Sequence, residues 1–333
     1  MFETRLAMIS ISRPPIAGSG ILVTGGAGFI GSHLVDRLLQ LDAREVVVID
    51  NLFTGDSANL DGALETARAT LYRDDAEHST SLDYIFAKHS IDVVFNCATK
   101  ALNYSFLNPA NAYATNVIVL LNLLELQRRG VFATLCHFST SEIYGTAIYE
   151  PMDEAHPRNP TTTYAAGKAA ADMALESYVR MFELDSFIVR PFNNYGPRQN
   201  YQGMLAGVIP VTARRILTGG VPEIHGDGKQ SRDFIYVSDT VDAVTKLYAV
   251  LTAGESVNIS TDNQLTISEL IQRVTIDLGY TGPINFGPAR QADVLCHNAS
   301  NAKLRSLIDF NLTSFDEGLS RTLAYYKKIF GKS

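Results

Sequence analysis

A tyrosine and a lysine spaced four residues apart could carry out acid–base chemistry on a hydroxyl group. Tyr164 and Lys168 lie in an alanine-rich stretch, and side chains four residues apart share one face of a helix. Because a nearby ammonium lowers the pKa of a phenol, we expect a Tyr164 phenolate that takes a hydroxyl proton while hydride leaves the same carbon. The spacing alone also arises by chance, so neighbouring motifs must decide.

A second polar group follows a short apolar run. The stretch FSTSEIYG, residues 138–145, places Thr140, Ser141 and Glu142 where a buried strand should end and a loop begin. Loops at strand ends carry many catalytic residues because a rigid scaffold positions them. We therefore predict that these three residues act together with Tyr164 and Lys168. A solvated loop carboxylate is the alternative for Glu142.

A glycine-rich loop near the start of the chain predicts a dinucleotide site. In TGGAGFIG, residues 24–31, Gly25, Gly28 and Gly31 follow an apolar strand and open a helix, whose N-terminal amides and dipole attract a pyrophosphate. Asp50 ends the next strand, where a carboxylate can hold ribose hydroxyls and repel a 2′-phosphate. This favours NAD over NADP, with a tight turn and a surface aspartate as the alternative.

Alternating strands and helices surround these motifs. Apolar strand patterns alternate with amphipathic helical patterns from Ile21 to Phe192, which predicts right-handed crossovers and a parallel sheet covered on both faces. The predicted fold is α/β, a Rossmann-type doubly wound parallel sheet. The expected strands are 21–24, 45–50, 92–98, 132–140 and 186–192, and the expected helices are 32–41, 81–89, 111–130 and 161–184.

After Phe192 the alternation gives way to a loop, a helix at 207–217 and a glycine-containing, hairpin-like segment at 221–239. We interpret this region as a smaller C-terminal α/β domain that binds the substrate and shares the chain with the first domain. The predicted division is a loose N-terminal extension at 1–19, a Rossmann domain at 20–192 plus about 236–260, and a substrate domain at 193–235 and 261–330.

Composition narrows the function classes. The chain has 333 residues, a net charge of −7 and three cysteines. The lack of a basic patch makes nucleic acid an unexpected partner, and no apolar run is long enough to suggest a membrane span. Scattered cysteines do not form a disulfide framework and fit a reducing cytoplasm. We predict no metal site.

Six motifs in order resemble one known family. TGGAGFIGSHL, DNLFTG, STSEIYG, YAAGK, RPFNNYGPRQ and GDGKQSRDFIYVSD are similar to the extended short-chain dehydrogenase/reductases that act on nucleotide sugars, and the likeness spans roughly residues 20–330. The resemblance implies bound NAD, Thr140 on the sugar 4-hydroxyl, Tyr164 as base and Lys168 as its partner. It also implies NAD contacts from Phe29, Ile30, Asn51, Asp74, Asp75, Ala98, Thr99 and Asn116, and substrate contacts from Lys100, Tyr104, Asn193, Val208, Arg232 and Arg290.

Glu142 decides which reaction of that family we expect. The resemblance implies oxidation of the sugar at C4, and the resulting ketone acidifies the proton on C5. A 4-epimerase needs no base at C5, whereas a 4,6-dehydratase does. Glu142 would remove that proton, water would leave from C6, and hydride would return to C6. The stretch after STSEIYG most resembles the nucleotide-sugar 4,6-dehydratases of the legionaminic-acid route, although Ser141 stands where many dehydratases carry Asp.

Three other functions stay open. A UDP-glucuronate decarboxylase would need a cation for the substrate carboxylate, and Lys100 could supply it. A 4-epimerase would use the same Tyr164 and Lys168. A non-catalytic NAD sensor is the remote alternative, because such proteins commonly lose the tyrosine or the lysine, whereas this chain keeps both. The resemblance also implies a homodimer formed by a four-helix bundle of the helices around 110–129 and 162–183.

Overall fold

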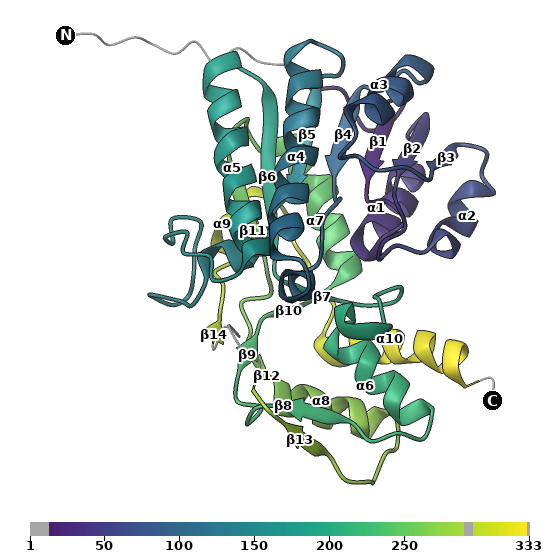
Figure 1. Ribbon diagram of the computed structural model, residues 1–333, viewed down its shortest axis with the longest axis vertical. Helices are drawn as coiled ribbons and strands as arrows, with labels where there is room; N and C mark the ends of the chain where they lie inside the picture. Colours follow the sequence, from purple (N-terminus) through teal and green to yellow (C-terminus); the bar gives the residue numbers. More distant parts are fainter. Residues whose placement is uncertain (1–12, 290–295, 332–333) are drawn as a thin grey trace.

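Seven parallel strands form the centre of the molecule. The computed structural model describes residues 13–289 and 296–331. The strands lie in the order β11-β6-β5-β4-β1-β2-β3 (Figure 1), and every neighbouring pair is parallel. The direction in which successive strands are added reverses between β1 and β4, which creates a crevice at their carboxyl ends. The bounds are β1 Gly20–Thr24, β2 Glu45–Ile49, β3 Ala69–Tyr72, β4 Val93–Asn96, β5 Thr134–Phe138, β6 Asp185–Pro191 and β11 Ser256–Ile259.

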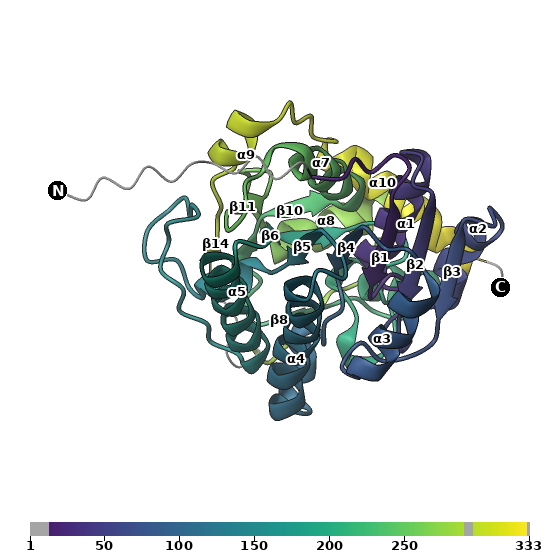
Figure 2. The ribbon, with the colours of Figure 1, turned by 90° about the horizontal axis from the view of Figure 1, so that it is seen from above.

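Helices cover both faces of this sheet because its strands are buried and apolar on both sides. One apolar core joins the sheet to α1 (Phe29–Gln40) and α7 (Val237–Val250). A second core joins the other face to α3 (Ser79–Lys88), α4 (Pro109–Arg128) and α5 (Thr163–Phe182). Figure 2 shows α4 and α5 side by side on that face. The predicted doubly wound α/β fold is confirmed.

The region beyond the carboxyl edge of the sheet has its own apolar core, with Ile209, Leu270 and Leu323 at its centre (Figure 1). A capping box formed by Thr266 and Glu269 starts α8, which satisfies backbone N–H groups at the helix end. The helices of this region are α6 Val208–Leu217, α8 Ile267–Asp277 and α10 Phe315–Phe330. The short helix α9 (Ala302–Leu307) instead packs against β11, with Leu304 in the first core of the central sheet. The remaining short helical turns are η1 Ser57–Leu60, α2 Asp61–Leu64, η2 Leu102–Phe106, η3 Ser141–Tyr144 and η4 Gly203–Leu205.

The hairpin expected at 221–239 is wrong. The segment contains three short strands, and each pairs with a distant part of the chain rather than with its neighbour. The glycines in this segment make turns, but the pairing is chosen by burial against distant strands, which a local pattern does not record. The pairs are β8 (Glu223–His225) with β13 (Asn285–Gly287), β9 (Ser231–Arg232) with β12 (Leu265–Thr266) and β14 (Cys296–His297), and β10 (Phe234–Tyr236) with β7 (Asn193–Tyr195).

Residues 13–19 are held against the sheet and are not the loose extension that we expected. The Arg13 guanidinium donates from Nε to Asp185 Oδ2 over 2.8 Å and also donates to the carbonyl of Tyr248. It stacks on Phe187, 4.7 Å from the ring centroid. The expectation for residues 1–12 lies outside the described residues. Within the described residues, no helix is long and apolar enough to cross a membrane, and no cluster of three potential metal ligands occurs.

Replacing Arg13 with alanine should lower the free energy of unfolding by about 2–3 kcal/mol, because the buried Asp185 carboxylate loses its cation. Chemical denaturation measures this change. Arg44→Ala is the matched control, since Arg44 forms an exposed ion pair with Asp92 and should cost less than about 1 kcal/mol. Equal effects of the two variants would contradict a specific anchor at Arg13.

Candidate active site

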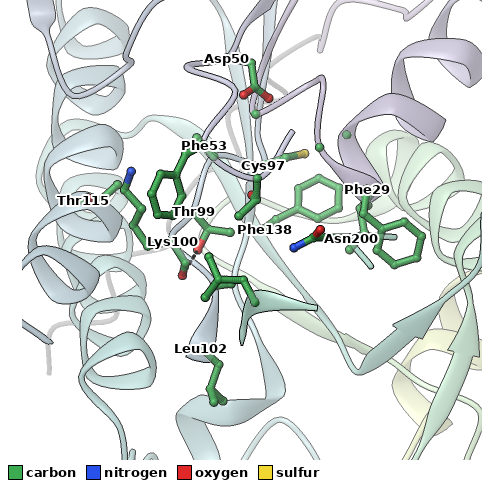
Figure 3. A pocket seen from close by; sticks show the side chains of 18 of the residues that line it. Phe29, Asp50, Phe53, Cys97, Thr99, Lys100, Leu102, Thr115, Phe138 and Asn200 are labelled. Carbon is green, nitrogen blue, oxygen red and sulfur yellow. Dashed lines mark hydrogen bonds between the residues drawn. The ribbon is translucent and has the colours of Figure 1, made fainter. Parts of the chain in front are cut away.

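A cavity of about 440 Å³ occupies the crevice at the carboxyl edge of the sheet. Its walls come from the glycine loop, the ends of β2, β4 and β5, the start of α5, and the segment that follows β7 (Figure 3). Most residues predicted from the glycine loop and from the Tyr164 motif therefore share one cavity. These predicted residues are Gly25, Gly28, Phe29, Ile30, Gly31, Asp50, Asn51, Asp74, Asp75, Ala98, Thr99, Lys100, Thr140, Tyr164 and Lys168.

The glycine loop is shaped for close approach of a ligand. Gly25 has φ +68°, and a Cβ on it would lie 2.8 Å from the backbone of Ala98. A Cβ on Gly31 would lie 2.3 Å from the carbonyl oxygen of Gly25, so a larger residue would force the loop open. Gly28 caps α1 without any side-chain hydrogen bond. The first N–H groups of α1 thus face the cavity end of the loop, as a pyrophosphate requires.

Asp50 connects this loop to β2. It is 8% exposed, and its carboxylate accepts hydrogen bonds from the backbone N–H groups of Ala27 and Leu52 over 2.9 and 2.8 Å. Burial raises the pKa of Asp50, while those N–H groups and that of Gly28 oppose the rise. Asn51 donates to Asp75 over 2.7 Å at the same end of the cavity. These residues fit the ribose and adenine end of NAD.

Thr99 and Asn116 act as a pair. The Thr99 hydroxyl lines the cavity and donates to Asn116 Oδ1 over 2.8 Å. Asn116 is 1% exposed and is not among the residues that line the cavity, so its contact with the site is through Thr99. Nearby, the Lys100 ammonium lies 4.0 Å from the ring centroid of Phe53 and 5.9 Å from that of Tyr104. Figure 3 shows Lys100 and Phe53 next to each other across this part of the site.

Tyr164 is placed by the first turn of α5. The Thr162 side chain caps the helix by accepting from Ala165 N, and Tyr164 N donates to the Ser105 hydroxyl over 2.9 Å. Burial raises the pKa of Tyr164 to about 12, and the Glu142 carboxylate adds to this rise. Hydrogen bonds with the Thr140 and Thr99 hydroxyls lower the pKa and so favour the phenolate. In the protein without its cofactor, the pKa of Tyr164 is therefore raised and not lowered, because burial is the largest influence on it.

Lys168 is 2% exposed and donates from Nζ to the carbonyl oxygen of Phe138 over 2.7 Å. This bond ties α5 to the end of β5 and aims the ammonium at the cavity floor. Burial lowers the pKa of Lys168 to about 8, and the carboxylate of Asp172 opposes this shift. Lys168 is therefore a cation at neutral pH, but by a narrow margin.

The predicted trio at 140–142 forms the beginning of η3. Thr140 lines the cavity and accepts from the backbone N–H of Glu142 over 3.2 Å. Ser141 is 3% exposed, and Glu142 is half-buried. Neither is among the cavity-lining residues, yet the Glu142 charge reaches the Tyr164 phenol. Glu142 therefore lies beside the acid–base pair, just beyond the cavity wall.

The predicted substrate contacts are brought together only in part. Lys100 lines the cavity, whereas Tyr104, Asn193, Val208 and Arg232 do not. Asn193 donates to the carbonyl of Asp233 over 3.4 Å, and Arg232 donates to that of Ser231 over 2.8 Å. Both lie in short strands, β7 and β9. Arg290 lies outside the described residues.

Several cavity residues were missed from sequence. Asn194, Gln199, Asn200 and Gly207 line the cavity, and Figure 3 shows Asn200 next to Phe29. Asn103 donates to the carbonyl of Met204 over 2.8 Å, which joins η2 to η4. Gln199 and Asn200 directly follow the glycine–proline–arginine turn of a motif that we recognised. That adjacency is the one signal that could have identified them.

Comparisons with known proteins agree with this geometry. Residues 21–260 match the NAD dependent epimerase/dehydratase family. A putative UDP-glucose 4-epimerase of Methanocaldococcus jannaschii is 33% identical over 92% of this chain and 98% of its own length. UDP-glucuronic acid decarboxylase 6 of Arabidopsis thaliana is 35% identical over 76% of this chain and 73% of its own length. A dTDP-glucose 4,6-dehydratase of Streptomyces venezuelae, solved with NAD, superposes with a TM-score of 0.88 at 30% identity, covering 94% of this chain and 98% of that one.

The matched region contains the glycine loop, Asp50, Tyr164 and Lys168, and the cavity that they share fits NAD. The similar proteins differ in the reaction that their names give, but each name contains a nucleotide sugar. The chain is an extended short-chain dehydrogenase/reductase and belongs to the NAD dependent epimerase/dehydratase family of nucleotide-sugar enzymes.

Proposed function

We propose that the chain is a nucleoside-diphosphate-hexose 4,6-dehydratase, a lyase without net oxidation or reduction. The observation that carries this proposal is the placement of the Glu142 carboxylate beside Tyr164, close enough to raise the pKa of its phenol. A carboxylate at this point disfavours the Tyr164 phenolate, so an enzyme that only oxidised and reduced C4 would be hindered by it. It is useful where a second proton must be removed from the neighbouring carbon.

The first step uses the cavity residues. NAD, when bound, accepts hydride from C4 of the sugar and returns it later. Thr140 and Tyr164 hold the 4-hydroxyl, and Tyr164 accepts its proton. Because burial disfavours the phenolate, its formation depends on the Lys168 ammonium and on the positive charge of the oxidised cofactor. The Thr140 hydroxyl accepts from the Glu142 N–H, which leaves its own proton free to be donated to the phenolate and to add to that stabilisation.

The second step uses Glu142. The C4 ketone makes the C5 proton acidic, Glu142 removes it, and the C6 hydroxyl leaves with a proton as water. Ser141 cannot supply that proton as a carboxylic acid would. The Glu142 carboxyl, protonated by C5, is the acid available for it. Return to C6 of the hydride taken from C4, and addition to C5 of a proton from solvent, then complete a 4-keto-6-deoxy sugar, while Tyr164 releases to solvent the proton that it took from the 4-hydroxyl.

UDP-glucuronate decarboxylation is the second candidate. It is favoured by Lys100, a cation that is 8% exposed and lines the cavity, and by the similarity to Arabidopsis decarboxylases. In that reaction, the C4 ketone lies β to the C6 carboxylate, which leaves as carbon dioxide. The 4-epimerase alternative has relatives of its own but gives Glu142 no task.

Glu142→Gln should stop the reaction after C4 oxidation, because the amide keeps the shape and loses the basicity. We expect product formation to fall by roughly 100-fold or more, with NADH accumulating in its near-ultraviolet absorbance band. Deuterium from solvent should enter C5 with the unaltered protein and fail to enter with the variant. Tyr164→Phe is the control that should prevent NADH formation altogether.

A panel of nucleotide sugars, with products weighed by mass spectrometry, identifies the reaction. Loss of water supports the dehydratase, and loss of carbon dioxide from a glucuronate supports the decarboxylase. Full activity of Glu142→Gln with an unchanged product mass would leave only the epimerase.

The cofactor site predicts a preference for NAD over NADP, because Asp50 repels a 2′-phosphate. Asp50→Asn should reduce that preference by about tenfold or more, equivalent to about 1.4 kcal/mol. Binding titrations with both dinucleotides measure it. Asp61→Asn, at an exposed position of α2, should leave the preference unchanged. Equal affinities of the unaltered protein would remove this role of Asp50.

We also propose a homodimer formed through α4 and α5. These helices pack so closely that a Cβ on Gly167 would lie 2.7 Å from the Tyr113 carbonyl. Their outer sides expose Tyr113, Ile118 and Met173 at 42%, 39% and 59%, more apolar surface than an isolated subunit needs.

The two described thiols, Cys97 and Cys136, are free, which fits our proposal of a cytoplasmic enzyme.

Ile118→Glu should convert the dimer to a monomer, because a charge would be buried in the interface. Sedimentation measures the mass. Ile276→Glu, in α8 and 70% exposed in the native protein, should not change it. A native protein that sediments as a monomer would contradict the four-helix bundle.

A further inference from the structure

A row of buried polar side chains crosses the central sheet beneath α5, the helix that carries Tyr164 and Lys168. The Thr24 hydroxyl donates to Asn96 Oδ1 over 2.6 Å, and Asn96 Nδ2 lies 3.0 Å from His137 Nδ1. His137 Nε2 faces Asp172 Oδ1 at 3.8 Å, and Arg190 donates to Asp172 Oδ2 from Nε and Nη2 over 3.1 and 3.0 Å. All five residues are at most 1% exposed. The proposed chemistry uses none of them.

The hydrogen bonds fix the charge of His137. Because the Asn96 carbonyl accepts from Thr24, its amide nitrogen must donate to His137 Nδ1. The proton of the neutral ring therefore resides on Nε2, on the side of Asp172. Burial lowers the pKa of His137 well below its usual value, and the charges of Lys168 and Arg190 add to that effect. His137 is thus neutral and presents an N–H edge, rather than a charge, to Asp172.

Asp172 lies one helical turn after Lys168 on α5, so the two side chains share a face of the helix. Both are buried, and the two hydrogen bonds from Arg190 go to Oδ2 alone. The Asp172 carboxylate is therefore a negative charge in a low-dielectric region beside a buried ammonium. An electrostatic interaction is strongest in such a setting.

We propose that Asp172 is a positioning residue for the acid–base pair, the buried counter-charge that keeps Lys168 an ammonium next to Tyr164. This inference rests on the proposed use of Tyr164 as the base, but not on the fate of the sugar after C4 oxidation. Asp172 does not line the cavity, so it acts only through Lys168.

The neighbouring charges agree with this role. Burial lowers the pKa of Lys168, and Asp172 is the largest opposing influence on it. Cys97, which directly follows β4, stays a neutral thiol because burial raises its pKa. Burial also raises the pKa of Asp172, and Arg190 on β6, the Ser139 hydroxyl after β5 and Arg158 in the loop before α5 oppose that rise. His137 on β5 completes the surroundings as a neutral group. The two hydrogen bonds from Arg190 favour the carboxylate form of Asp172, and the charge of that carboxylate acts on Lys168.

The charge of Lys168 sets the direction of the pH dependence. Lys168 is charged below its pKa of about 8, so oxidation at C4 is supported below that pH and is lost as pH rises through it. Without the Asp172 charge, the pKa of Lys168 must fall further, since burial still lowers it and the main influence that raises it is removed. The alkaline loss of activity then begins at a lower pH.

Two substitutions of the same ion pair test this role of Asp172. Asp172→Asn removes the negative charge, and Arg190→Gln removes the positive one, so both break the pair and both weaken the fold. The chain has nine lysines, few enough for NMR titration of the NAD-loaded protein with ¹³C-labelled lysine side chains. Loss of a signal in Lys168→Met assigns Lys168. The alkaline limb of single-turnover NADH formation is the second readout.

We expect Asp172→Asn to lower the pKa of Lys168 by about one unit or more. The pH at which NADH formation is lost on the alkaline side should fall by the same amount. Arg190→Gln should lower neither the pKa nor that pH. Asp172→Glu should restore both values toward those of the native protein. If Asp172→Asn fails to fold, the Asp172→Asn/Arg190→Gln double variant, which leaves no unpaired charge, should show the same downward shift.

The proposal would be overturned if the pKa of Lys168 stayed the same in Asp172→Asn or, where that variant does not fold, in the double variant. It would also be overturned if Arg190→Gln lowered the pKa of Lys168 by as much as Asp172→Asn does. Either result would mean that the ion pair of Asp172 and Arg190 is purely structural. The titration needs no substrate. Its result therefore holds even if the enzyme proves to be a decarboxylase or an epimerase. The mass analysis of products tests the proposed dehydratase reaction separately, so either proposal can fail without the other.

Discussion

All strands of the central sheet run in one direction, so every strand delivers its following loop to the same edge. The glycine loop after β1, Asp50 after β2, Thr99 after β4 and Thr140 after β5 meet there because of this single constraint. The reversal of strand order between β1 and β4 opens the crevice into which they project. The helices that cover the sheet then need only bring Tyr164 and Lys168 to the same edge.

Burial governs the chemistry of this edge. It raises the pKa of Tyr164 and lowers that of Lys168, so the protein alone holds a neutral phenol and a weakly held ammonium. In the proposed mechanism, Asp172 keeps Lys168 charged and the positive cofactor favours the Tyr164 phenolate, whereas the Glu142 carboxylate opposes that phenolate. In a low-dielectric site, each of these acts more strongly than it would in water.

The scaffold and the reaction are specified by different parts of the chain. Proteins named as epimerases, decarboxylases and dehydratases are all similar to this chain in sequence, and solved structures of an epimerase and a dehydratase share its fold. The differences must lie in the short segments around the cavity, such as Ser141 and Glu142 in η3, Lys100 after β4, and Gln199 and Asn200 after β7. Such loops can change without disturbing the core that holds them.

The sequence alone determined the features that are local. The alternation of apolar strands and amphipathic helices predicted the doubly wound sheet. The glycine spacing and Asp50 predicted the NAD site, and the four-residue spacing placed Tyr164 and Lys168 on one face. Each depends on neighbours along the chain, whose periodicity and turn chemistry are readable directly.

Only the tertiary structure decided the rest. The strands within 221–239 choose distant partners, Arg13 finds Asp185, Asn116 lies behind Thr99, and Asn194 rather than Asn193 reaches the cavity. The pKa of Tyr164 rises although a lysine lies one turn away. Pairing and burial join residues far apart in the chain, and the energy of a buried charge depends on everything around it. No local pattern of residues contains that information.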